Sequence, residues 1–64
     1  MYQATALRKL PFGAPFRLTP RQTEEWHLSG YDRKRRRFCA TAANGARVTI
    51  RPRRKVYAHP ATIR

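Results

Sequence analysis

The chain has 64 residues, with 15 Lys and Arg against three Asp and Glu, and its formal net charge is +12. This length allows one domain with a thin core, because chains of about 60 residues bury only ~60% of their extended surface. A single Cys excludes an internal disulfide, and no apolar run forms a signal-peptide core or approaches the ~20 residues of a membrane span. Composition therefore predicts one small basic domain over residues 1–64, in a reducing, cytoplasmic setting and without a membrane partner.

Short segments fill the first 19 residues. Residues 1–10 alternate as a strand would, although residues 6–10 would equally make one helical turn. Residues 10–13, Leu-Pro-Phe-Gly, are typical of a turn with Pro second and Gly fourth. Residues 16–19 form a short strand candidate, and the prolines on both sides confine it to a sheet edge or a strand start.

Residues 19–30 allow two interpretations. A Thr-Pro pair at the start and a Gly at the end would cap a helix. The large apolar residues inside the segment, Trp26 and Leu28, lie two positions apart, which is the spacing of a strand. We favour a loop or single turn over 20–23 and a strand over about 24–31, and we keep the helix as the alternative.

Two hairpins are predicted after this strand. The first has a four-residue loop at Arg33–Arg36, and the second turns at Asn44-Gly45, since both residues tolerate positive φ. The first hairpin then pairs Asp32–Arg37, Tyr31–Phe38, Gly30–Cys39, Leu28–Thr41 and Trp26–Ala43. The second pairs Ala43–Ala46, Ala42–Arg47, Thr41–Val48, Ala40–Thr49, Cys39–Ile50 and Phe38–Arg51.

These registers give the sheet one apolar face and one mixed face. The apolar face, which we expect to form the core, carries Trp26, Leu28, Cys39, Thr41, Val48 and Ile50. The solvent face carries His27, Ser29, Tyr31, Phe38, Ala40, Arg47, Thr49 and Arg51. Two independently chosen turns agree on these faces, and a one-residue slip would invert a strand.

The remaining residues complete an all-β fold. Residues 55–58 make a last short strand, and residues 59–64 a flexible tail. An open sheet this small would leave its edges exposed and be barely stable. We therefore predict a small antiparallel meander that closes to an SH3-like or OB-like barrel, with room for one short helical turn.

Catalytic signals are weak in this chain. Glu24 and Glu25 would point to opposite faces of a strand, and Asp32 is a turn residue that accepts backbone N–H groups or pairs with the cations after it. The two histidines and Cys39 have no metal-ligand spacing, and the glycines are isolated rather than gathered in a phosphate loop. We predict a non-enzymatic protein without a metal or a cofactor.

The cations indicate an anionic partner. Twelve of the fifteen are Arg, whose planar fork of donors suits phosphate and which also stacks on bases. The clusters Arg33–Arg37 and Arg51–Lys55 flank the second hairpin, so folding would bring them together at one pole. Like charges so close repel each other, and an anionic ligand would relieve that repulsion.

Nucleic acid, DNA or RNA, is the predicted partner. Tyr31 and Phe38 are expected to be cross-strand neighbours beside cations, and single-strand binders stack bases on such rings. Phosphate contacts are predicted from Arg33, Lys34, Arg35, Arg36, Arg37, Arg53, Arg54 and Lys55. Stacking or groove contacts are predicted from Tyr31, Phe38, Arg47 and Arg51. Alternatively, the two rings cover each other or form a second small core under the N-terminal segment, and the arginine run is a solvated loop or a nuclear-import signal.

Two segments carry a resemblance. Residues 7–18, LRKLPFGAPFRL, resemble the opening Leu-x-x-Leu-Pro-x-Gly-x-x-Phe-x-Leu of many small phage and plasmid proteins. Residues 30–33, Gly-Tyr-Asp-Arg, with Arg-Phe at 37–38, resemble their later hairpin. The resemblance implies a mobile-element protein with a small β fold, in the bacterial cytosol or an infected host cell.

Other partners stay open at this point. A phage or plasmid inhibitor or adaptor would dock on an acidic surface of a host protein. A ribonucleoprotein component would also combine a high Arg content with a small barrel. Exposed strand edges and a thin core would also allow a homodimer.

Overall fold

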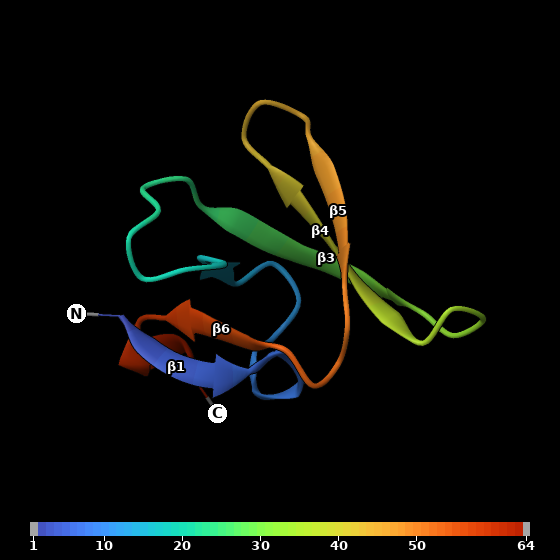
Figure 1. The fold of residues 1–64 in the computed structure, drawn as a ribbon, viewed down its shortest axis with the longest axis horizontal. Helices are drawn as coiled ribbons and strands as arrows, with labels where there is room; N and C mark the ends of the chain where they lie inside the picture. Colours follow the sequence, from blue (N-terminus) through green and yellow to red (C-terminus); the bar gives the residue numbers. More distant parts are fainter. Residues whose placement is uncertain (1, 64) are drawn as a thin grey trace.

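Six antiparallel strands and two short 3-10 helices make up the fold, in a computed structural model that describes residues 2–63 (Figure 1). The strands are β1 (Gln3–Ala6), β2 (Pro15–Phe16), β3 (Trp26–Asp32), β4 (Arg37–Ala42), β5 (Arg47–Ile50) and β6 (Lys55–Ala58). The 3-10 helices are η1 (Leu7–Lys9) and η2 (Pro60–Thr62). The all-β prediction is confirmed, and both interpretations of the first ten residues are realised, a strand and then a helical turn.

A backbone bridge joins the strands into one curled surface. β1 pairs with β6, and the other four strands form a sheet in the order β2-β3-β4-β5. Just after β2, the N–H of Arg17 donates to the carbonyl of Tyr57 in β6 at 2.8 Å, and the N–H of Tyr57 donates back at 2.9 Å. The β1–β6 pair therefore lies against the larger sheet, below it in Figure 1. The result is a small, barrel-like β fold.

The segment before β3 is a turn followed by extended chain. The N–H of Gln22 donates to the carbonyl of Thr19 at 3.3 Å, and β3 begins at Trp26. The strand prediction for this region is thus confirmed and the helix alternative is wrong. The earlier turn lies one residue later than predicted, because Gly13, with φ +90°, takes the third position of a turn over residues 11–14.

The first hairpin has the predicted four-residue loop. Asp32 pairs with Arg37, and its Oδ1 accepts hydrogen bonds from the backbone N–H groups of Lys34 at 3.0 Å and Arg35 at 3.2 Å. Arg36 closes the loop in the left-handed region, at φ 54°. The expectation that Asp32 is a turn residue bonded to backbone N–H groups is confirmed.

The second hairpin differs from the prediction by one residue. Its loop has three residues, 43–45, and Ala42 rather than Ala43 faces Ala46. Gly45 at φ +88° ends the loop, as in a three-residue turn with a left-handed glycine. The observed pairs are Phe38–Ile50, Cys39–Thr49, Ala40–Val48 and Thr41–Arg47. The predicted two-residue register is therefore wrong.

A bulge shifts the register of the first hairpin as well. Leu28 pairs with Ala40 but Gly30 with Cys39, so Ser29 is an extra residue in β3. The predicted pairs are correct between the bulge and the loop. Before the bulge, the observed partners of Leu28 and Trp26 each lie one residue earlier in the chain than the predicted partners. The two irregularities offset each other at the start of β3 and on β5, whereas β4 and the end of β3 beyond the bulge, which carries Tyr31, are inverted relative to the prediction. Hence the predicted burial of Cys39 and Thr41 is wrong, and the buried residues of β4 are Ala40 and Ala42.

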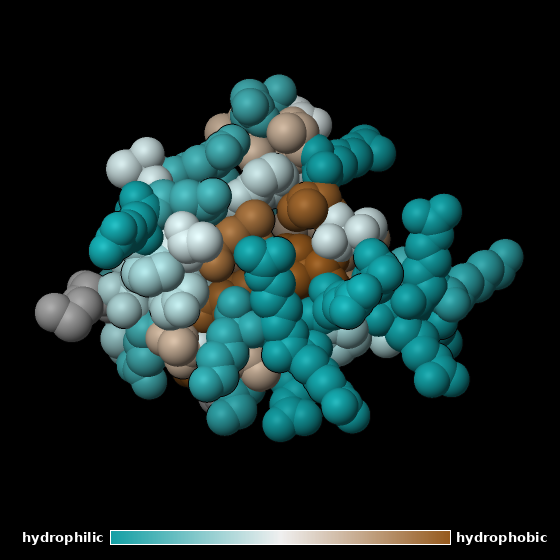
Figure 2. All heavy atoms as spheres, viewed as in Figure 1, coloured by the Kyte–Doolittle hydropathy of each residue, from teal (hydrophilic) through white to brown (hydrophobic). Residues whose placement is uncertain are grey.

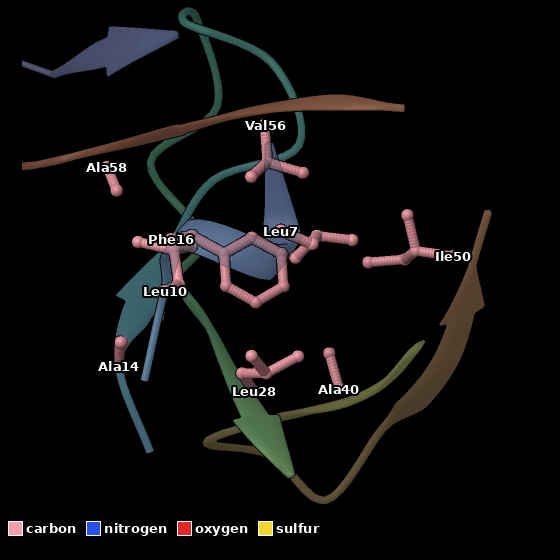
Figure 3. Close-up of a cluster of buried hydrophobic side chains, with 9 residues drawn as sticks. All are labelled: Leu7, Leu10, Ala14, Phe16, Leu28, Ala40, Ile50, Val56 and Ala58. Atoms are coloured by element: carbon pink, nitrogen blue, oxygen red, sulfur yellow. The ribbon is translucent and has the colours of Figure 1, made fainter. Parts of the chain in front are cut away.

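The core surrounds the ring of Phe16 (Figure 3). Its buried cluster consists of Leu7, Leu10, Ala14, Phe16, Leu28, Ala40, Ile50, Val56 and Ala58, and partly buried Leu18, Trp26, Phe38, Val48 and Ile63 pack against it. Three of the nine buried residues are alanines, so the core is small even for this chain. The predicted core positions Trp26, Leu28, Val48 and Ile50 do face it.

The C-terminal segment is held at its first residues. The Nδ1 of His59 accepts a hydrogen bond from the backbone N–H of Ala61 at 3.1 Å, which caps η2. Ile63 follows and packs against the core. The segment expected as a tail thus contains a helical turn and one core contact. Across residues 2–63, no helix is long and apolar enough to cross a membrane.

Replacing Phe16 by Ala should lower the free energy of unfolding by about 3–5 kcal/mol, because the ring is fully buried. Phe12 is 67% exposed, so Phe12→Ala is the matched control and should change stability by less than about 0.5 kcal/mol. Urea denaturation followed by Trp26 fluorescence measures both. Equal losses in the two variants would contradict the core assignment.

Gly45→Ala should destabilise the chain by about 1 kcal/mol, since a Cβ resists the positive φ although no atom lies within 4 Å of its position. Gly30→Ala is the control, with equally open space and no positive φ, and should be neutral or slightly stabilising. Thermal unfolding of the two variants distinguishes them. A Gly45→Ala variant as stable as Gly30→Ala would rule out the three-residue turn.

Candidate nucleic-acid interface

Arginines from both clusters meet at one end of the sheet. Because Phe38 pairs with Ile50, the start of β4 and the end of β5 lie side by side. One groove there is lined by Arg35, Arg36, Arg37, Arg51, Pro52 and Arg53, a surface that we name the arginine pole. In Figure 2, hydrophilic side chains project from this end of the molecule, where Figure 1 shows the loop between β3 and β4. The antiparallel hairpin thus brings the two clusters together, as the spacing predicted.

Four of the predicted phosphate contacts lie outside the groove. Arg33 and Lys34 are exposed on the β3–β4 loop, Arg54 is exposed in the turn after β5, and Lys55 begins β6. None of the four is among the residues that line the arginine pole.

Local bonds fix the two loops that carry the pole. Besides its two backbone hydrogen bonds, Asp32 places Oδ2 4.0 Å from Nε of Arg35. In the second loop, the N–H of Arg54 donates to the carbonyl of Arg51 at 3.1 Å, and Pro52 sets φ inside this turn. Both loops are therefore ordered by the backbone before any ligand arrives.

The charge of the molecule is polarised. Glu24 and Glu25 lie just before β3, at the opposite end of that strand from the pole. Glu25 accepts a hydrogen bond from the Tyr2 hydroxyl, which raises the pKa of Tyr2, and lies 3.9 Å from Arg17. Asp32 is thus the one acid beside the arginine pole among the three acids of the chain.

Tyr31 and Phe38 form the predicted cross-strand pair. Their ring centroids are 4.9 Å apart and their planes are inclined by 63°, an edge-to-face arrangement. The Tyr31 ring is 41% exposed, whereas Phe38 is half-buried and packs against the core. Placement of Phe38 and Ala40 on the solvent face is therefore wrong, because the bulge and the turn invert β4. The aromatic pair lies at the open end of the inner face.

A second groove runs beside the aromatic pair. Its lining consists of Ala6, Arg8, Tyr31, Phe38, Pro52 and Arg53. The N-terminal segment therefore does approach the two rings, as one alternative held, but it leaves an open hollow there rather than a closed second core. Pro52 and Arg53 belong to this groove and to the arginine pole alike.

Two arginines expected beside the rings lie elsewhere. Arg47 pairs with Thr41 and lines a hollow on the outer face with Cys39 and Thr49. Since alternate residues of a strand point to opposite faces, Arg47 is on the other side of the sheet from Phe38. Arg51 follows Ile50 rather than pairing with Phe38, and it lines the arginine pole instead.

Sequence reasoning missed Arg8 and Phe12 as site residues. Arg8 lies in η1 and reaches the aromatic pair only because β1 folds back on β6. Phe12 is 67% exposed in the turn before Ala14. An aromatic residue at the tip of a Pro-Phe-Gly turn has no core position to fill, and that signal was present in the sequence.

Within residues 2–63, no three His, Cys, Asp or Glu side chains gather where a metal ion could be held. Compared with known proteins, the chain matches no family model, no curated protein and no solved structure. The site is therefore interpreted from its own residues.

Screening of the arginine pole should stabilise the fold. Raising salt from about 20 to 200 mM should increase the free energy of unfolding by about 1 kcal/mol, because close like charges repel less. Arg36→Gln, in the pole, should reduce this salt-induced increase in the free energy of unfolding. Arg47→Gln, on the outer face, should reduce the increase less than Arg36→Gln does. Urea titrations at the two salt concentrations measure the effect. Identical salt dependence in both variants would mean that the repulsion is not concentrated at the pole.

Proposed function

We propose that this protein binds nucleic acid, without catalysing a reaction, through the arginine pole and the adjacent aromatic pair. One observation carries the proposal: five arginines from two separate clusters line a single groove next to a partly exposed ring. Phosphate is the ligand that such an array of guanidinium groups suits best. The aromatic pair then supplies a surface for bases.

Energetics favour a bound polyanion. Five guanidinium groups around one groove, with Asp32 as their one neighbouring acid, repel each other and are only partly compensated. A phosphate backbone would neutralise several of them at once and release its condensed counterions. The ordered loops reduce the entropy cost of that contact.

The proposal also includes a setting. The likeness of residues 7–18 and 30–33 to small phage and plasmid proteins supports a mobile-element protein acting in a bacterial cytosol or an infected cell. The single Cys39, half-buried and free, suits a reducing compartment.

Salt dependence tests the proposed binding. If the five arginines of the groove each contact a phosphate, log affinity for a single strand should fall with log salt at a slope of about −3.5. Affinity should then drop about a hundredfold between 50 and 200 mM salt. Fluorescence anisotropy of a labelled oligonucleotide measures the slope.

Matched variants locate the contacts. Arg35→Gln with Arg36→Gln should flatten the slope by about 1.4 and weaken all sequences alike. Arg21→Gln with Arg47→Gln removes the same charge away from the pole and should change the slope far less. No affinity at low salt, together with specific capture of an acidic protein, would replace nucleic acid by a host protein as the partner.

A further inference from the structure

Three hollows on the surface adjoin one another through shared lining residues. The arginine pole shares Pro52 and Arg53 with the hollow of the aromatic pair. That hollow shares Arg8 and Phe38 with a third, which is lined by Arg8, Leu10, Pro11, Phe12 and Phe38. We name these three adjoining hollows, from the arginine pole to Phe12, the long groove.

We propose that the long groove binds an extended single strand of nucleic acid, with Phe12 stacking on a base at the far end from the pole. This inference rests on the proposed function and names its substrate class. Phe12 and Arg8 become binding residues, and neither was among the contacts predicted from the sequence.

The exposed large apolar side chains of the described residues both lie along the long groove. Among residues 2–63, the large apolar side chains that are exposed are Phe12, at 67%, and Tyr31, at 41%. Both line the long groove, from segments almost twenty residues apart in the chain. Two exposed rings along one groove offer stacking faces to bases, whereas the other aromatic side chains are buried or half-buried.

The turn that carries Phe12 is held in place by the sheet. The N–H of Gly13 donates to the carbonyl of Leu28 at 2.6 Å, and the N–H of Leu28 donates to the carbonyl of Ala14 at 3.2 Å. A further bond closes the turn, from the N–H of Ala14 to the carbonyl of Pro11 at 3.1 Å. Phe12 is thus exposed on a fixed backbone, and stacking on it would order little more than its own side chain.

Cations and rings lie next to each other along the long groove. Arg8 and Arg53 line the hollow of the aromatic pair, and Arg8 also lines the hollow of Phe12. A single strand offers both phosphates and unpaired bases, and single-strand binders combine basic grooves with stacking rings. A duplex keeps its base faces stacked inside, so it would contact the arginines but not the ring faces.

The test compares single strands with duplexes. Labelled oligothymidylates of about two and about ten nucleotides, and a duplex of about ten base pairs, are titrated at low salt by fluorescence anisotropy. Phe12→Ala should weaken binding of the longer single strand about tenfold, with its salt slope unchanged, and should leave the dinucleotide and the duplex unaffected. Arg8→Gln should weaken the longer strand and flatten its slope by about 0.7, while Arg21→Gln, the charge-matched control, should not.

Each other outcome decides against the inference. If Phe12→Ala binds the single strand as tightly as the wild type does, while the variant Arg35→Gln with Arg36→Gln binds more weakly, the long groove is not the binding site. The proposed function would then still hold. If the duplex binds more tightly than the single strand at equal salt, the long groove is likewise rejected as a single-strand site and the proposed function is kept. If the wild-type chain shows no affinity for any of these nucleic acids, both proposals are rejected. Circular dichroism of Phe12→Ala checks that the variant is folded.

Discussion

Pairing of β4 with both of its neighbours determines the rest of this structure. One side of β4 supplies Ala40 and Ala42 to the core, and its ladder with β5 sets Arg37 close to Arg51. The same ladder with β3 places Phe38 against Tyr31. Core, arginine pole and aromatic pair therefore share one register, so a slip of one residue in β4 would disturb all three together.

The register also shows what local signals in the sequence determine. Turn residues and apolar spacing predicted the hairpins, the strand at Trp26 and the meeting of the two basic clusters. They did not reveal the extra residue at Ser29 or the three-residue turn that ends at Gly45, because both depend on how the sheet coils around the core. Asn-Gly favours a two-residue loop, but it also fits a three-residue loop that ends on a left-handed glycine.

The positions of some candidate site residues could not be predicted from local sequence signals, because they also depend on how distant strands pair. The arginine pole follows from the hairpin alone, but the place of Arg8 depends on β1 returning to pair with β6 across the whole chain. Arg47 was misplaced relative to the aromatic pair because the sequence cannot show which face β4 presents. Long-range pairing, rather than composition, assigns these residues to a face.

The core of this chain is thin, so it offers little stability against the repulsion between its many surface cations. In the fold, the core and the most crowded cations lie in different parts of the molecule. Phe16, Leu7 and Val56 are fully buried at the junction of the two sheets, where Tyr2, Glu25 and Arg17 also join the N-terminal strand to the chain before β3. The uncompensated arginines lie at the far end of β3. Repulsion between them therefore acts at one end of the sheet, away from the buried contacts.

Three departures from ordinary local rules lie along one surface. Arg36 takes a positive φ that bulky residues rarely adopt, five arginines crowd one groove, and Phe12 is left in solvent. Natural chains tolerate such departures mainly where a ligand compensates for them. Because all three departures lie along the long groove, a single elongated anion would relieve the charge and cover the exposed ring in one binding event.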